Sequence, residues 1–207
     1  MRGNFTAVKD NNMIITIARQ CGSGGLIIAE LLSKHYGIPF YTIKRLEAMA
    51  EAKGIKDEMS DFFAEYPVNT LLYAITQSDS MGHVTDQTRN SLQSLVGESD
   101  CIIVGRCGNY VFRDRKDLVS VFLKGDRAKR IKFMAEYKSI SQVDAEELVD
   151  GKDESRRAYH NYYTGETWGD ADKYDICVDS NKLGFENAAQ IIEWYADNVL
   201  RNCASVK

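Results

Sequence analysis

The chain has 207 residues, of which 44% are hydrophobic and 27% are charged, a balance typical of an ordinary globular domain. Its formal charge of −4 argues against polymeric nucleic acid as a partner, because neutralising a phosphate backbone requires a surplus of Lys and Arg. No apolar stretch is long enough to cross a bilayer, and the five cysteines contain no Cys-x-x-Cys pair, so we expect a cytoplasmic protein with no membrane partner.

The first predicted unit, residues 13–41, is a strand followed by a glycine-rich turn and a helix. The run from Met13 to Ile17 is rich in β-branched residues and typical of a parallel strand that is buried on both faces. The cluster Gly22-Ser23-Gly24-Gly25 follows, and apolar residues then recur with helical spacing until Gly37. We therefore expect the segment from Ile14 to Ala29 to be the first strand, phosphate loop and first helix of a nucleotide-binding α/β domain.

The middle of the chain is predicted to be helical. A helix from about Ile43 to Lys53 leads into mixed helical segments between Asp57 and Gly97, without a strong strand signal. The apolar positions of these segments include Phe62, Phe63, Leu71, Leu72 and Ile75.

Two further buried strands are predicted after residue 100. Cys101–Val104 ends in Gly105-Arg106, and Leu118–Leu123 leads into a helix from about Asp126 to Tyr137. The alternation of strands and helices predicts a parallel sheet with helices on both faces and ligands at the carboxyl ends of the strands. We expect Gly22–Gly25, Arg106 and the strand end near Lys124 to converge there.

The segment from Ser141 to Trp168 is polar, charged and rich in tyrosine. We expect it to form an exposed helical flap with Ser141 as its N-cap. A last strand is predicted at Asp175–Val178. The closing amphipathic helix, from Gly184 to Leu200, is expected to turn four residues inward: Ile191, Ile192, Tyr195 and Val199.

The glycine-rich turn favours phosphate binding. Backbone N–H groups in such a turn point at an anion, and the following helix N-terminus adds partial positive charge. The alternative is a structural turn that only needs glycine. The Walker pattern is incomplete, since Arg19 replaces its first glycine, Gly25 its lysine and Leu26 its Ser or Thr.

The sequence resembles the cytidylate kinase-like family, a divergent branch of the P-loop nucleoside monophosphate kinases that also lacks the Walker lysine. The resemblance covers nearly the whole chain from Met13 onward. Its motifs are Ile15-Thr16-Ile17-Ala18-Arg19-Gln20-Cys21-Gly22-Ser23-Gly24-Gly25, Gly37-Ile38-Pro39-Phe40-Tyr41, Ile103-Val104-Gly105-Arg106-Cys107, Arg130-Ile131, Asp153 with Arg156 and Tyr159, Tyr162-Tyr163-Thr164-Gly165, Trp168-Gly169 and Tyr174-Asp175.

The resemblance implies a single domain over residues 1–207, with an α/β, P-loop nucleoside triphosphate hydrolase-type three-layer fold. A five-stranded parallel sheet would carry a helical monophosphate-binding region at about 43–97 and a helical lid at about 141–168. The implied reaction transfers the γ-phosphoryl group of ATP, or another nucleoside triphosphate, to a monophosphate such as CMP, with Mg²⁺. The implied partner is a small phosphorylated molecule, and the oligomeric state stays open.

Eleven residues are candidates for this site. Arg106 resembles the family's monophosphate-binding arginine, Arg156 and Arg157 could swing over the phosphates from the flap, and Arg130 is a weaker catalytic candidate. Each arginine has a plain alternative: a surface ion pair for Arg106, a solvated helix face for the flap pair, and pairing with Asp126 for Arg130. The expected donor-binding residues, with Arg157, are Arg19, Cys21, Gly22, Ser23, Gly24, Gly25 and Leu26.

No protein metal site is predicted. His35, His83 and His160 lack ligand-like spacing, and we expect them at the surface or at helix ends. Cys21 and Cys107 are interpreted as small buried hydrophobes.

Three functions stay open. The first is the phosphotransferase. The second is a nucleotide-binding protein with lost or altered kinase activity, because Leu26 and Ile27 stand where the family commonly has Arg-Glu and Asn109 where aspartate is usual. The third, an interaction module, rests on the tyrosine-rich flap alone.

Overall fold

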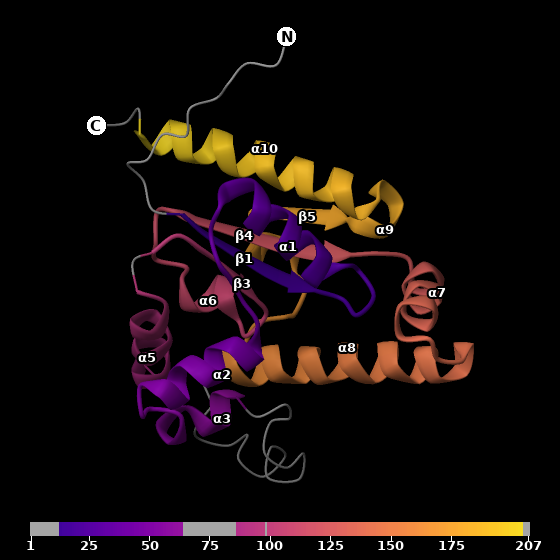
Figure 1. Ribbon diagram of the computed structural model, residues 1–207, viewed down its shortest axis with the longest axis horizontal. Helices are drawn as coiled ribbons and strands as arrows, with labels where there is room; N and C mark the ends of the chain where they lie inside the picture. Colours follow the sequence, from indigo (N-terminus) through magenta and orange to yellow (C-terminus); the bar gives the residue numbers. More distant parts are fainter. Residues whose placement is uncertain (1–12, 64–85, 98, 205–207) are drawn as a thin grey trace.

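Five parallel strands form the central sheet, in the spatial order β2-β3-β1-β4-β5 (Figure 1). The computed structural model describes residues 13–63, 86–97 and 99–204. The strands are β1 (Ile14–Arg19), β2 (Phe40–Tyr41), β3 (Cys101–Val104), β4 (Leu118–Lys124) and β5 (Ile176–Asp179).

The central strand β1 is buried on both faces. Ile15 and Ile17 pack into the core on one side of the sheet, and Ile14 packs into the core on the other. In register, Ile14 lies opposite Cys101 of β3 and Leu118 of β4. A strand with two buried faces needs apolar side chains on both, so the prediction of a parallel strand buried on both faces is confirmed, and the structure places this strand in the middle of the sheet.

Helices cover both faces of the sheet (Figure 1). On one face, α1 (Gly25–Tyr36) and α10 (Phe185–Ala204) pack against each other and on the strands. The other face is covered by a second core built from α2, the segment from η1 to α3, α5, α6 and part of α8. Their bounds are α2 Ile43–Ala52, η1 Asp57–Met59, α3 Ser60–Phe63, α5 Asp86–Val96, α6 Gly108–Val111 and α8 Gln142–Thr164.

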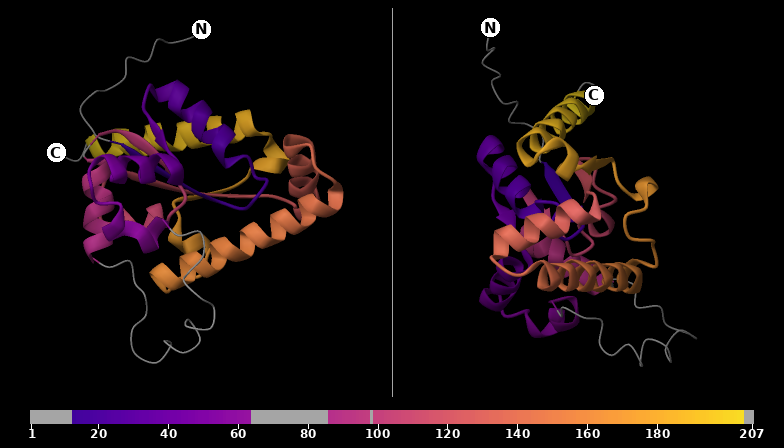
Figure 2. Two further views of the ribbon diagram at one scale, coloured as in Figure 1. Left: turned by 60° about the horizontal axis from the view of Figure 1, so that its bottom comes forward. Right: turned by 90° about the vertical axis from the view of Figure 1, so that its right-hand side faces the viewer.

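Helix α7 (Arg127–Lys138) and the long α8 form a hairpin at one end of the molecule, seen clearly in the left view of Figure 2. Asp126 caps α7 by accepting the Lys129 amide, and Ser141 caps α8 by accepting the Asp144 amide, as predicted for Ser141. The hairpin has its own small core, in which Ile131 and Met134 meet Ala145, Val149 and Cys21.

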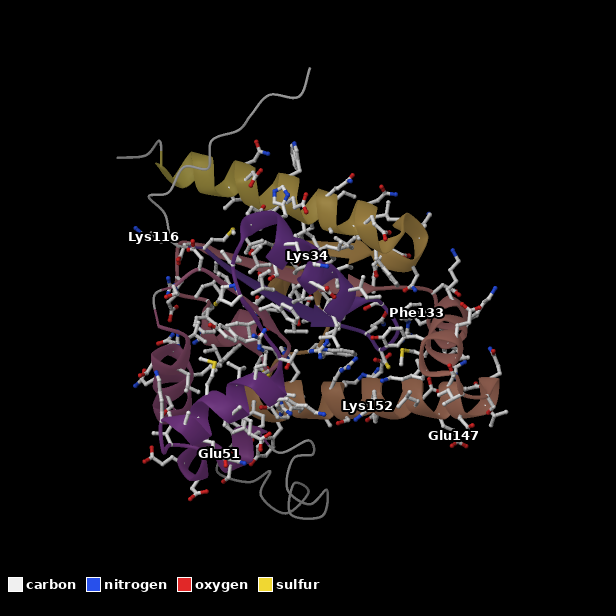
Figure 3. The ribbon with its side chains drawn as sticks, viewed as in Figure 1. Lys34, Glu51, Lys116, Phe133, Glu147 and Lys152 are labelled. Carbon is white, nitrogen blue, oxygen red and sulfur yellow. The ribbon has the colours of Figure 1, made fainter. Side chains whose placement is uncertain are left out.

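Side-chain directions agree with this packing. In Figure 3, Phe133 points from α7 toward the body of the molecule, whereas Glu147 points from α8 into solvent. Two short helical segments, η2 (Ala171–Lys173) and α9 (Ser180–Leu183), flank β5. In the described ranges, no helix is long and apolar enough to span a membrane.

Three predictions require correction. The flap is one continuous helix with a buried face, because Val149, Tyr159 and Tyr163 pack into the cores. Ile191 is exposed on α10, since the residues that turn inward there are Ala188, Ala189, Ile192 and Ala196, with Tyr195 partly buried. The last strand begins at Ile176 rather than Asp175.

The predicted helical structure of the middle region is confirmed where the region is described. Phe62 and Phe63 are buried in the second core. The other expected apolar positions, Leu71, Leu72 and Ile75, lie outside the described residues.

Candidate active site

The glycine-rich loop joins the end of β1 to the start of α1, and two of its glycines have positive φ. Gly22 has φ +81° and Gly24 has φ +74°. A Cβ on Gly22 would lie 2.6 Å from the carbonyl oxygen of Arg130, and one on Gly24 would lie 2.5 Å from the ring of Phe185. Both conformation and space therefore require glycine at these positions.

The loop ends in the N-terminus of helix α1. Gly24 is the N-cap, and the first helical hydrogen bond runs from the Ile28 amide to the Gly24 carbonyl at 2.9 Å. The preceding amides of Gly25, Leu26 and Ile27 have no acceptor within the helix, and the helix dipole adds about half a positive charge. This geometry suits an anion such as phosphate.

Gly25, which replaces the Walker lysine, lies against an arginine. A Cβ at Gly25 would lie 2.9 Å from Cγ of Arg19, and one at Gly105 would lie 2.1 Å from the Arg19 Nη1. The Arg19 side chain thus runs from the loop toward the end of β3. It brings a cation to the loop that lacks its lysine.

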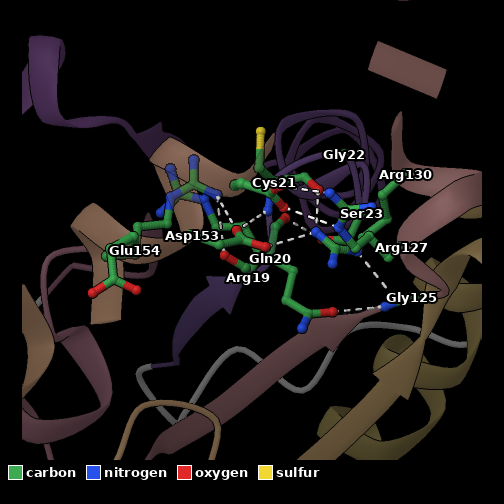
Figure 4. A network of polar contacts seen from close by, with 12 residues as sticks. Arg19, Gln20, Cys21, Gly22, Ser23, Gly125, Arg127, Arg130, Asp153 and Glu154 are labelled. Carbon is green, nitrogen blue, oxygen red and sulfur yellow. Dashed lines mark hydrogen bonds and ion pairs between the residues drawn. The ribbon is translucent and has the colours of Figure 1, made fainter. Parts of the chain in front are cut away.

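A carboxylate from α8 reaches into the loop (Figure 4). Asp153 accepts the Cys21 amide through Oδ1 at 2.6 Å and Nη1 of Arg130 through Oδ2 at 2.6 Å. Arg130 also donates to the carbonyls of Cys21 and Gly125, and Gln20 accepts the Gly125 amide. Arg130 is buried, so its predicted alternative, a surface pair with Asp126, is wrong.

Beside the loop, a cavity of about 190 Å³ opens at the carboxyl ends of β1 and β3, underneath α8. Its lining includes four cationic residues and, among the described residues, no Asp or Glu. The cations are Arg19, Arg106, Lys152 and Arg156. The other lining residues are Ala18, Ile43, Val104, Gly105, Cys107, Asn109, Ser155, Tyr159, His160 and Trp168.

Arg106 is fixed at the wall of this cavity. Its guanidinium donates to the carbonyls of Phe62 at 2.9 Å and Phe63 at 3.3 Å, and lies 4.6 Å from the centre of the Tyr159 ring. The Tyr159 hydroxyl donates to the same Phe62 carbonyl at 2.7 Å. Arg106 and its neighbour Cys107 both have left-handed backbones, with φ +57° and +52°. Such strain is concentrated at functional sites.

Arg19 and Arg156 lie at the junction of loop and cavity. Arg156 donates from Nη1 to the Arg19 carbonyl at 3.2 Å, and the same atom lies 3.8 Å from Oδ1 of Asp153. Burial, together with the charges of Arg156 and Arg106, lowers the pKa of Arg19 to about 9. An anion in the cavity would relieve this repulsion.

Three other titratable groups are buried near the cavity. Burial raises the pKa of the Cys107 thiol to about 12 and also raises that of Cys21, so both cysteines are protonated small hydrophobes, as predicted. His160 is buried, which lowers its pKa to about 4. The prediction that His160 lies at the surface is therefore wrong. His35 lies in the last turn of α1, as expected. His83 lies outside the described residues.

The structure brings together Arg19, Arg106, Arg130 and Arg156 with the loop Cys21–Gly25. It does not bring the side chains of Leu26 or Arg157 to the same place, although the Leu26 amide belongs to the helix N-terminus. The Leu26 side chain is about half exposed, and Arg157 pairs with Glu154 on the exposed side of α8, 6.0 Å from the centre of the Trp168 ring.

The sequence interpretation did not select Lys152, Asp153 or Tyr159 as site residues. Each of them lies three or four residues from Arg156 along α8, and this helical spacing is the signal that could have identified this face of the helix.

No group of three or more His, Cys, Asp or Glu that could hold a metal is found in the described residues. Mg²⁺ is commonly bound through one or two carboxylates together with substrate phosphates and water. The Asp153 carboxylate, which reaches the loop, is already bound to the Cys21 amide and to Arg130.

The sequence profile of the cytidylate kinase-like family matches residues 14–182. The chain belongs to this family. A relative from Methanococcus maripaludis (strain C5), named cytidylate kinase, is 26% identical over 190 residues, which cover 90% of this chain and 99% of that protein.

Solved structures agree on the fold. An uncharacterized protein from Eubacterium ventriosum is similar with a TM-score of 0.70 and 28% identity, covering 90% of this chain and 99% of the other. A shikimate kinase from Bacteroides thetaiotaomicron has a TM-score of 0.50 and 10% identity, covering 89% and 98%, and supports the P-loop kinase fold alone.

Proposed function

We propose that this chain is an ATP-dependent phosphotransferase that moves the γ-phosphoryl group to a nucleoside monophosphate, with CMP the first acceptor to test, or to a related small acceptor. The observation that carries the proposal is the cavity beside the loop, whose lining has four cations and no carboxylate among the described residues. In a chain with a net charge of −4, such a concentration of cations favours a small anionic ligand.

The two halves of the site have different roles. The amides at the start of α1 hold the donor phosphates, and Arg19 supplies the positive charge that Gly25 cannot. Arg106, whose planar guanidinium suits bidentate phosphate contact, holds the acceptor phosphate. When bound, ATP supplies the phosphoryl group and Mg²⁺ neutralises part of its charge.

Arg156 lies between the two halves. It contacts the backbone of Arg19 and lines the cavity, so it can stabilise charge on the transferring group. Arg130 orients the loop from the donor side. The chemistry is mostly alignment and charge neutralisation, which needs no nucleophile from the protein.

A turnover panel tests the proposal. Nucleoside monophosphates and small alcohols are incubated with ATP or GTP and Mg²⁺, and product is measured. We expect at least one monophosphate to be phosphorylated. Arg106→Met should then lower kcat/KM about 10- to 100-fold, which is the value of a charged hydrogen bond of ~1.5–3 kcal/mol.

The matched control is Arg113→Met, which removes an exposed arginine that lies over Tyr110 and should leave kcat/KM unchanged. Turnover of no acceptor would overturn the enzyme proposal.

One observation favours a second candidate, a nucleotide-binding protein without turnover. At the position of the metal-binding hydroxyl of other P-loops, Leu26 is about half exposed and has no oxygen. Nucleotide binding without turnover across the whole panel would support this alternative.

A further inference from the structure

The carboxylate of Asp153 is bound to the glycine-rich loop, a few residues before the α1 amides to which the proposed function assigns the donor phosphates. It accepts the loop amide of Cys21 and a guanidinium N–H of Arg130, both at 2.6 Å. Only 10% of this side chain is exposed. The loop is therefore already holding an anion, which the protein itself supplies (Figure 4).

The partners of Asp153 are the groups that phosphate uses. Backbone amides of a glycine-rich turn and a guanidinium are the usual ligands of phosphate oxygens. Residues 21–25 are all buried in this arrangement. A phosphate oxygen cannot take the Cys21 hydrogen bond while Asp153 accepts it, because one N–H makes one good hydrogen bond.

The other ion pairs of acidic residues on α8 lie at the protein surface, away from the glycine-rich loop. Arg127 pairs with Glu146 and Asp150, and Arg157 pairs with Glu154, all on exposed surface. Asp153 differs from these acidic residues of α8 because it is buried and reaches a backbone amide 132 positions away in the chain.

We propose that donor phosphate and the Asp153 carboxylate are alternative ligands of the Cys21 amide and Arg130, so that nucleotide binding releases the middle of α8 from the loop. This inference rests on the proposed function, since it requires a nucleotide in the loop. The exchange leaves no buried cation unpaired, because one anion replaces another. It also transfers Arg130, and Arg156 next to it, from the carboxylate to the phosphate.

Asp153→Asn tests this exchange, because asparagine keeps the shape of the side chain and removes its charge. Binding of ATP with Mg²⁺, and of tripolyphosphate with Mg²⁺, is measured by calorimetry. With the competitor neutralised, we expect Kd for both probes to fall about tenfold, which corresponds to ~1.4 kcal/mol.

Glu154→Gln is the matched control. It removes the same charge from the next residue of α8, whose carboxylate pairs with Arg157 at the surface, and should leave Kd unchanged. A simple structural role for Asp153 predicts the opposite sign, because loosening Arg130 would weaken binding. Weaker or unchanged binding by Asp153→Asn therefore overturns the inference.

Folding provides a second readout. If Asp153→Asn is unfolded alone, we expect ATP with Mg²⁺ to restore its circular dichroism spectrum, since phosphate supplies the missing anion. A variant that stays unfolded with ATP contradicts the exchange. Wild-type protein that binds neither probe overturns the proposed function as well, whereas wild-type binding with a weaker variant overturns only the exchange.

Discussion

At the scale of single residues, Arg19 depends on two glycines that leave room for it. Side chains at Gly25 or Gly105 would collide with its stem and its guanidinium. The positive charge of Arg19 is unfavourable in the folded protein, because burial and the neighbouring charges of Arg156 and Arg106 oppose it. Arg19 is therefore expected to lower the stability of the ligand-free protein in return for anion binding.

Arg19→Met should separate these two effects. We expect the variant to be about 1 kcal/mol more stable without ligand, a Tm higher by ~2–4 °C, because a crowded charge is replaced by an apolar chain of similar length. Its nucleotide affinity should fall. Thermal unfolding with and without ATP measures both, and a lower Tm for the ligand-free variant would show that Arg19 stabilises the fold.

His160 predicts an acid-sensitive fold. Its pKa is lowered from 6.5 to about 4, so between these values the unfolded chain binds a proton that the folded chain does not. Stability is complete above pH 6.5 and is lost as the pH falls toward 4. From pH 7 to 5 we expect a loss of about 2 kcal/mol that His160→Gln removes.

Urea unfolding at the two pH values measures this loss. Glu166, 3.9 Å from Nε2, faces the imidazole and would reduce the effect. The control is His35→Gln, since the His35 side chain is about half exposed. Equal acid losses in wild type and His160→Gln would contradict the assignment.

Sequence alone could identify the glycines and arginines at this scale, but not the buried contacts of Asp153 or the burial of His160. A glycine cluster between a strand and a helix has few physical explanations. One aspartate in a helix that also contains Asp144 and Asp150 has many, and only the tertiary packing decides which reaches the loop.

At the scale of elements, α8 is the helix that joins the two halves of the site. It carries Asp153 to the loop and Arg156 and Tyr159 to the cavity. The sequence predicted its start at Ser141, because a cap is a local signal. It did not predict the burial of one face, because polar residues alternate with the apolar ones that pack inward.

Substitution by alanine is expected to change the stability in opposite directions at Gly151, inside α8, and at Gly165, the C-cap of α8. Gly151 lies inside the helix, is exposed, and has open space around its missing Cβ. Gly151→Ala should stabilise the protein by about 0.5–1 kcal/mol, since glycine is unfavourable in a helix interior.

Gly165→Ala is the matched control. Gly165 caps the same helix with φ +69°, and alanine there should destabilise by about 1–2 kcal/mol. Chemical denaturation of both variants measures these changes. A destabilised Gly151→Ala variant would indicate that α8 bends at this residue.

At the scale of the whole molecule, the sheet and its helical layers were predictable because hydrophobic runs and glycine turns are local. The placement of α8 across the strand ends was not, since it depends on contacts between distant segments. The resemblance to a family supplied the number of strands, which the structure confirms.

Ligand binding should be visible in global stability. ATP with Mg²⁺ at 100 times its Kd should stabilise the fold by ~2.7 kcal/mol, or about 5–10 °C in Tm. Adenosine, which lacks phosphates, should raise Tm very little, because the cations that line the cavity are expected to interact with phosphate. Equal shifts with both ligands would place recognition on the base instead.

The length and stiffness of α8 have one more consequence. Asp153 and Tyr159 are six residues apart, so a rise of 1.5 Å per residue separates them by ~9 Å along the axis. The helix therefore fixes the distance between the residue that contacts the loop and the residue that lines the cavity. One residue inserted between them would rotate everything beyond it by about 100° and misalign one half of the site relative to the other.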